Sequence, residues 1–278
     1  MRSRCPVLLF ALALASLIAG AAVDARQQEP AKPYTPPRTP DGQPDIQGIY
    51  NPVGTFYNIE DLEYQSLYQN FKPNPSLRGK SLIIDPPDGK IPYQTWAAEK
   101  RKPIYQLHGD PTPQYVDPNA RCWPQGVPRH VNNREFEIFQ PPGYVVIFNM
   151  AHHTYRAITL DGSPHIPESV KLWLGDSRGR WEGNTLVVDV TNNNDQTWFD
   201  VMASFHSDAM RVTERMTPVS ADRIEYQAVI TDPKVYTRPW TFAIYFNRNK
   251  DYGSELWEEA CVESNDRNLE LLKRPGRN

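Results

Sequence analysis

The sequence predicts a mainly β protein built around an antiparallel barrel. Roughly eight or nine short apolar segments follow one another in the second half, separated by turns rich in Gly, Pro, Asn and Asp. This spacing is typical of an all-β barrel or sandwich rather than of alternating strands and helices. Hydrophobic residues occupy 39% of the 278 positions and aromatic residues 11%, which is enough to build a core. Since no repeat of fixed period is present, a propeller or a solenoid is disfavoured.

Each expected strand is recognised by its apolar pattern and by the turn that ends it. The segments are residues 45–50, 135–139, 144–150, 153–160, 172–182, 185–191, 211–216, 223–231, 241–246 and 255–262. Because alternate side chains of a strand share a face, three segments present a continuous apolar face, formed by Leu186, Val188 and Val190, by Ile224, Tyr226, Ala228 and Ile230, and by Trp240, Phe242, Ile244 and Phe246. A short helix is expected over residues 95–102, with Pro103 as its stop.

The N-terminus has the pattern of an export signal. Arg2 and Arg4 precede nineteen uncharged, mostly apolar residues, and small residues follow. This arrangement predicts a signal peptide over residues 1–25 and a periplasmic or secreted protein, with an uncleaved membrane anchor as the alternative. After cleavage, no integral membrane segment is expected.

The mature chain divides by composition into four regions. Residues 26–44 hold six prolines and predict an extended tether. Residues 45–130 lack a sustained period and are expected to form a largely irregular region packed on the barrel. The barrel itself is expected over residues 131–265, followed by a C-terminal tail over residues 266–278.

The overall charge argues against one class of partner. The chain has 30 Lys and Arg residues and 33 Asp and Glu residues, a formal net charge of −3. Proteins that bind nucleic acids or anionic membranes show a basic excess. The sequence therefore predicts a small-molecule ligand and no nucleic-acid partner.

Two cysteines remain after signal cleavage, Cys122 and Cys261. In an oxidising compartment such a pair tends to form a disulfide bond, which would close a loop of about 140 residues. A catalytic thiol is the alternative, although no Cys–His signature accompanies either cysteine.

The densest group of candidate catalytic residues surrounds His206. His206 and Asp208 are two residues apart and would share a strand face, so that the carboxylate orients an imidazole for acid/base work. Glu214 is a second candidate base or a partner of Arg215, and His153, one of two adjacent histidines, completes the catalytic set. The alternative is a capped loop with surface ion pairs.

The expected ligand site is a lipocalin-like cavity, which requires that the polar strand faces point into the barrel rather than to water. Aromatic walls suit sugars and aromatic compounds because flat rings stack. Four residues are expected to bind the substrate: Arg211, Asp189, Trp181 and Arg129. Arg211 would hold a substrate carboxylate or stabilise developing negative charge.

A metal site is a further alternative. His153, His165 and His206, with Asp189 or Glu214, include suitable ligands for zinc or iron. Their spacing in the sequence matches no metal-binding motif, so neither a metal nor a cofactor is expected.

A nucleophilic serine is the last alternative. Gly175-Asp176-Ser177-Arg178-Gly179 matches the G-x-S-x-G pattern. That pattern needs a preceding buried strand and a following helix, whereas Ser177 lies among expected antiparallel strands. A tight turn whose glycines accept a positive φ is therefore favoured.

Several motifs resemble those of a family of exported bacterial β-rich proteins without an assigned activity. They are Trp173-x-Gly175-x-Ser177-x-Gly179-x-Trp181-x-Gly183-x-Thr185-Leu186-Val187-Val188-Asp189, His206-Ser207-Asp208-Ala209 and Asp232-Pro233-Lys234-x-Tyr236-Thr237-x-Pro239-Trp240-Thr241. The resemblance covers most of residues 45–265 and implies one exported β-rich unit. It supplies no substrate and no catalytic residue. The chain departs from the family at Asn192-Asn193, where a Gly–aromatic pair is expected.

These features predict an exported protein that binds a sugar-like or aromatic compound. They extend to cofactor-independent acid/base catalysis, as a hydrolase, lyase or isomerase, if two of the ionisable groups meet within hydrogen-bond reach in a cleft. A non-catalytic envelope or interaction protein would leave those groups scattered, and a metal-dependent enzyme is the remaining alternative.

Overall fold

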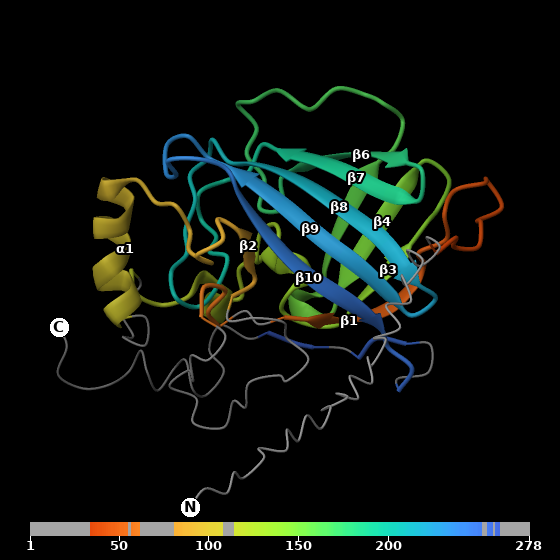
Figure 1. Cartoon of the computed structure of the whole chain (residues 1–278), viewed down its shortest axis with the longest axis horizontal. Helices are drawn as coiled ribbons and strands as arrows, with labels where there is room; N and C mark the ends of the chain where they lie inside the picture. Colours follow the sequence, from red (N-terminus) through yellow and green to blue (C-terminus); the bar gives the residue numbers. More distant parts are fainter. Residues whose placement is uncertain are drawn as a thin grey trace, which may run out of the picture. The chain divides into compact units, whose positions relative to one another are not determined.

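Nine strands close into a barrel because β1, the first strand in the order of the sheet, pairs both with its neighbour β3 and with β10. β1 (Gly48–Val53) pairs antiparallel with β3 (Phe136–Phe139) on one side and with β10 (Trp240–Arg248) on the other. In the computed structural model the order around the barrel is β1-β3-β4-β5-β6-β7-β8-β9-β10, and β2 (Ile83–Asp85) adds to β10 outside this ring (Figure 1). The remaining strands are β4 (Tyr144–Asn149), β5 (Thr154–Thr159), β6 (Asp176–Glu182), β7 (Thr185–Thr191), β8 (Arg211–Ser220) and β9 (Arg223–Thr231).

The structure describes residues 34–54, 57–61, 81–107, 114–251, 255–257 and 259–261. The expected signal peptide, the first part of the tether and the C-terminal tail lie outside these ranges. Among the helices within them, none is long and apolar enough to cross a lipid bilayer.

The mainly β prediction is confirmed, but the barrel is mixed rather than purely antiparallel. β5 and β6 run parallel and share one register pair, Thr159↔Arg178. The chain between them, residues 160–175, carries no strand and returns to the end at which β5 began. A connection of this length permits a parallel neighbour, whereas a tight hairpin turn requires an antiparallel one.

The strand that closes the barrel comes from residues 45–130, which were expected to be largely irregular, and it overlaps the strand that was expected over residues 45–50. Gly48–Val53 supplies β1, and Ile83–Asp85 supplies β2. Residues 255–262 were expected to form a strand, but the described residues among them, 255–257 and 259–261, have no regular secondary structure. Ile49, Tyr50 and Val53 of β1 are buried, and Tyr50 belongs to the hydrophobic core.

The predicted apolar faces point into the barrel. The alternating residues of β7, β9 and β10 are buried, as are their counterparts on β3, β4 and β8. Four of these residues are fully buried, namely Leu186, Val188, Tyr226 and Trp240. A side chain beside a cavity large enough for water would keep some accessible surface. These residues keep none, and all four belong to one hydrophobic core cluster. The prediction of a lipocalin-like central cavity is therefore wrong for this part of the interior, because large apolar side chains fill it.

The short predicted helix forms and is longer than expected. α1 spans Thr95–Leu107 and continues through Pro103. Proline removes one backbone donor, but its fixed φ is close to the helical value. Ala97 is the buried residue of α1, and Arg101 in the next turn binds Glu60 and Ser204.

Candidate functional site

A groove opens where β5 and β6 diverge, and we call it the seam groove. Its volume is about 480 Å³. One wall is the start of β5 with the preceding histidine, and the other is the segment that leads into β6. The lining residues are Pro124, His153, Thr154, Tyr155, Arg156, Ala157, Leu172, Trp173, Leu174 and Gly175.

The groove exists because the parallel pairing of β5 and β6 is so short. Beyond Thr159↔Arg178 the two strands share no further register pair. The wall at Leu172 is instead held by the end of β7, since the backbone N–H of Leu172 donates to the carbonyl of Asn192 over 2.8 Å. Gly175 has a φ of +65°, and a Cβ there would lie 2.6 Å from the carbonyl oxygen of Thr191. The tight approach of this wall to β7 therefore requires glycine.

Two aromatic side chains, Tyr155 and Trp173, line the seam groove. Tyr155 is 70% exposed, although it stands in a β-strand. Trp173 packs against Trp123, with ring centroids 5.2 Å apart. The guanidinium of Arg121 lies 4.4 Å from the centre of the Trp123 ring on the same loop. The groove thus combines aromatic surface with a nearby cation.

Four polar residues meet inside the barrel, and we call them the interior polar cluster. Arg156 donates through Nη1 to Glu214 Oε1 over 3.0 Å, through Nη2 to Glu214 Oε2, and through Nε to Ser177 Oγ over 2.9 Å. The hydroxyl of Tyr226 donates to Glu214 Oε1 over 2.6 Å. All four side chains are buried. Each charged group is therefore fully engaged with protein partners.

This cluster corrects two expectations. Glu214 was expected to act as a base or to pair with Arg215, but it pairs with Arg156 inside the barrel. Arg215 faces outward and binds Glu182 over 3.0 Å. Ser177 stands on β6 and accepts a hydrogen bond from Arg156, so the tight turn that was favoured for residues 175–179 is wrong, although Gly175 has a positive φ.

His130 lies buried next to the interior polar cluster. It is 1% exposed, and neither ring nitrogen has a hydrogen bond of good geometry among the described residues. Burial, followed by the charge of Arg156, lowers the pKa of His130 to about 3. The imidazole is therefore neutral at physiological pH.

The expected His206–Asp208 dyad does not form. His206 is buried, with its ring against Phe199 and Nε2 2.7 Å from Thr197 Oγ1. Asp208 points to solvent and binds the Nζ of Lys234 over 2.7 Å. Burial lowers the pKa of His206. The sequence spacing implied a strand here, but residues 206–208 precede β8 and do not alternate as a strand would.

The other expected substrate and catalytic residues are spread over different surfaces. His153 is exposed and lines the seam groove, whereas Arg211 is exposed at the start of β8. Trp181 packs against the core from β6. Arg129 is buried in a two-pronged ion pair with Asp117, at 2.6 and 2.8 Å. Among the described residues, no hydrogen bond joins any two of the six expected catalytic and ionisable site residues of the barrel: His153, Asp189, His206, Asp208, Arg211 and Glu214.

The expected metal ligands are likewise separated, except for one contact. His165 Nε2 lies 3.1 Å from Asp189, and His165 Nδ1 lies 2.6 Å from Asp176. Both ring nitrogens thus face carboxylates, and Arg178 also binds Asp176 over 3.0 Å. This arrangement ties the loop before β6 to β6 and β7. His153, His206 and Glu214 lie elsewhere.

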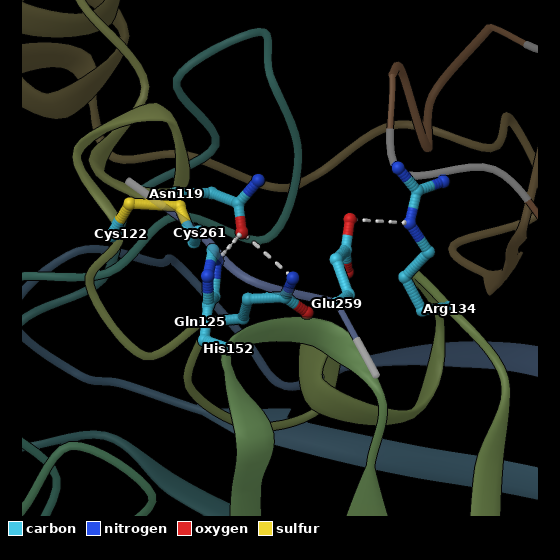
Figure 2. The surroundings of a disulfide bond; sticks show 7 residues. All are labelled: Asn119, Cys122, Gln125, Arg134, His152, Glu259 and Cys261. Atoms are coloured by element: carbon cyan, nitrogen blue, oxygen red, sulfur yellow. Dashed lines mark hydrogen bonds and ion pairs between the residues drawn. A yellow bond between two sulfur atoms is a disulfide. The ribbon is translucent and has the colours of Figure 1, made fainter. Parts of the chain in front are cut away.

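The disulfide prediction is confirmed. Cys122 and Cys261 are bonded, with their Cα atoms 5.6 Å apart. Figure 2 shows His152 beside this bond, together with Asn119 and Gln125. The bond joins the loop that carries Trp123 to a segment 139 residues further along the chain. One wall of the seam groove is thereby anchored to the C-terminal part of the protein.

A second hollow, of about 400 Å³, lies beside α1. Glu60 and Arg101 form an ion pair of 2.5 Å there, and Arg101 also donates to Ser204 Oγ over 3.0 Å. Asp200, whose pKa is raised by burial, accepts backbone hydrogen bonds from Ile59 and Ser204. These contacts hold α1 and residues 58–60 to the loop before β8, which is a structural role.

Sequence reasoning missed the residues that shape the groove, namely Tyr155, Trp173 and Trp123. A signal for the two tryptophans was present in the sequence, because Trp123 and Trp173 each lie in a segment that contains proline and glycine. Comparison with known proteins adds no assignment, since the chain matches no family model, no curated protein and no solved structure.

Proposed function

We propose that this protein is exported and binds a small ring-shaped compound, aromatic or sugar-like, in the seam groove. The observation that carries the proposal is a hollow of about 480 Å³ whose lining includes the exposed Tyr155 and the half-buried Trp173. Ligand pockets of proteins commonly measure roughly 300–1,000 Å³ and combine apolar walls with a few polar groups. Export is supported by the pattern of the first 25 residues and is consistent with the disulfide bond.

Binding rather than acid/base catalysis is the function that the groove supports better. Its lining contains one imidazole, that of His153, and no carboxylate. General acid/base catalysis by histidine ordinarily uses a second group that orients the ring or shares the proton. The guanidinium of Arg156 is already engaged with Glu214 and Ser177, so it is not available to a substrate without breaking the interior polar cluster.

Ring stacking explains how the groove would select its ligand. Tyr155 and Trp173 lie on opposite walls, β5 and the segment before β6. A flat ring placed against either aromatic face gains roughly 0.5–1.5 kcal/mol beyond its buried area. His153 and Thr154, at the same end of β5, add hydrogen-bonding groups for ring hydroxyls.

The test is a binding screen of phenolic and sugar libraries by tryptophan fluorescence and calorimetry. Replacing Trp173→Ala should weaken binding about two- to tenfold, as expected for the loss of one stacked ring. Tyr144→Ala is the matched control, because Tyr144 is an exposed aromatic residue on the neighbouring strand but does not line the groove. Equal affinities of the two variants, or no binder in either library, would refute the proposal.

A further inference from the structure

Three side chains with metal-binding atoms meet at the disulfide bond. The Sγ atoms of Cys122 and Cys261 and a ring nitrogen of His152 all lie within 4.8 Å of one another. Figure 2 shows the imidazole of His152 directly beside the two sulfur atoms. Within the described ranges, this is the one group of three His, Cys, Asp or Glu residues so arranged. All three residues are partly exposed, so solutes can reach them.

The imidazole of His152 is held in the tautomer that a metal ligand needs. Asn119 Oδ1 accepts a hydrogen bond from Gln125 Nε2 over 2.7 Å. The same oxygen lies 2.7 Å from His152 Nε2, so Nε2 must carry the proton. A neutral ring protonated at Nε2 has its lone pair on Nδ1.

That lone pair is unused. His152 Nδ1 is buried and has no hydrogen-bond partner among the described residues. A buried polar atom without a partner lowers the stability of the folded protein. In metal sites, a ligating histidine typically binds the metal through one nitrogen and donates from the other to an oxygen that fixes the ring. Asn119 occupies the place of that outer oxygen.

We propose that reduction of the Cys122–Cys261 bond converts this group into a binding site for a thiophilic divalent cation such as Zn²⁺. An external dithiol would reduce the bond by exchange: it supplies two electrons and two protons, the sulfur–sulfur bond breaks into two thiols, and the dithiol becomes a disulfide. The cation then displaces one proton from each thiol. Two thiolates and one neutral imidazole hold the cation, and water completes the tetrahedron. The bridged and the metal-bound states exclude each other.

The geometry requires only local movement. Bonds of about 2.3 Å from a tetrahedral zinc ion to two thiolates place the sulfur atoms roughly 3.8 Å apart. The sulfur atoms must therefore part, while the imidazole is already within 4.8 Å of both. In the metal-bound state the cation would join the Cys122 loop to the C-terminal segment in place of the covalent bond. This site is independent of the ligand proposed for the seam groove.

The test compares oxidised and reduced full-length protein. The reduced form is prepared with a phosphine, desalted under argon, and titrated with Co²⁺ and then with Zn²⁺. Reduced protein should bind one Co²⁺ per chain and show thiolate-to-cobalt charge-transfer absorption, which Zn²⁺ abolishes. Oxidised protein should show neither. Zn²⁺ should raise the Tm of the reduced form alone.

A matched pair of histidine variants decides the role of His152. His152→Ala should weaken Zn²⁺ binding at least about 100-fold, the upper end of what loss of an outer partner costs a metal site. His153→Ala should bind like the wild type, since His153 is the adjacent residue, also has a positive φ, and lies outside the ligand group. The proposal is overturned if reduced protein that retains its circular dichroism spectrum binds no Co²⁺, if reduction itself unfolds the barrel even with Zn²⁺ present, or if the two variants bind Zn²⁺ equally.

Discussion

Arg156 and Glu214 meet across the inside of the barrel. Arg156 stands on β5 and Glu214 on β8, two strands that are not neighbours in the sheet, yet Arg156 Nη1 and Glu214 Oε1 are 3.0 Å apart. Both side chains are at most 2% exposed. The pair therefore links β5 to β8 through the interior of the barrel rather than along a strand pair.

The first prediction concerns this pair. Glu214→Leu should lower the free energy of unfolding by roughly 3–5 kcal/mol, because it leaves a buried guanidinium without its counter-charge. The double variant Arg156→Met/Glu214→Leu should cost less than the sum of the two single variants, since it removes both charges. Urea unfolding measures these values. Arg215→Ala, which breaks an exposed pair with Glu182, should cost less than about 1 kcal/mol, and additive losses in the double variant would contradict the interpretation.

The second prediction concerns pH. The pKa of His130 is about 3 in the folded protein against an ordinary value of 6.5, so between these pH values the unfolded chain binds the extra proton. The free energy of unfolding therefore falls as pH is lowered through this window, by about 2 kcal/mol between pH 7 and pH 5 from this group. His206, whose pKa burial also lowers, acts in the same direction.

Unfolding of wild type and His130→Leu between pH 7 and pH 5 measures the effect. The variant should show a shallower loss of stability on acidification, whatever its stability at pH 7. His153→Gln is the control, because His153 is exposed, and its profile should follow the wild type. Parallel profiles of wild type and His130→Leu would show that His130 is not the group responsible.

The third prediction concerns the packing that holds His206. Gly126 has a φ of +72°, and a Cβ at this position would lie 2.3 Å from Thr197 Oγ1, the atom bound to His206. Gly126→Ala should destabilise the protein by roughly 2–5 kcal/mol, from backbone strain and a clash together. Gly162→Ala isolates the strain, because Gly162 has a φ of +73° and open space around it; its cost should be only about 1–2 kcal/mol. Equal losses in thermal unfolding would argue against the clash.

The fourth prediction concerns the disulfide bond. Its sequence separation is 139 residues, and in the chain-entropy model a loop of this length stabilises the folded state by about 5 kcal/mol. The double variant Cys122→Ser/Cys261→Ser should therefore unfold at a clearly lower urea concentration than the oxidised wild type. The variant and the reduced wild type, measured without added metal, should have similar midpoints. An unchanged midpoint in the variant would mean that the bond constrains little of the unfolded chain.

Local patterns predicted the strands well. β7, β9 and β10 start and end within one or two residues of the expected segments, and their apolar faces are buried as alternation required. The pattern is local because neighbouring side chains of a strand must point to opposite faces. The disulfide was also predictable, since only two cysteines remain after the expected cleavage.

The candidate site was not predictable in the same way. His206 and Asp208 are close in sequence but point apart, whereas Arg156 and Glu214 are 58 residues apart and form the buried pair. Spacing in the sequence constrains side chains on one strand and says little about which strands become neighbours. The seam groove depends on the parallel pairing of β5 with β6, and no residue in either strand signals that direction.

The sequence by itself determined the class of fold, the faces of the strands and the cysteine pair, because each follows from the chemistry of adjacent residues or from a simple count. Only the tertiary structure decided how the ring closes through β1, that β5 and β6 pair only at Thr159↔Arg178, and which polar groups meet inside the barrel. The physical reason is that these contacts join segments far apart in the chain, and their formation depends on the packing of the whole barrel rather than on any local preference.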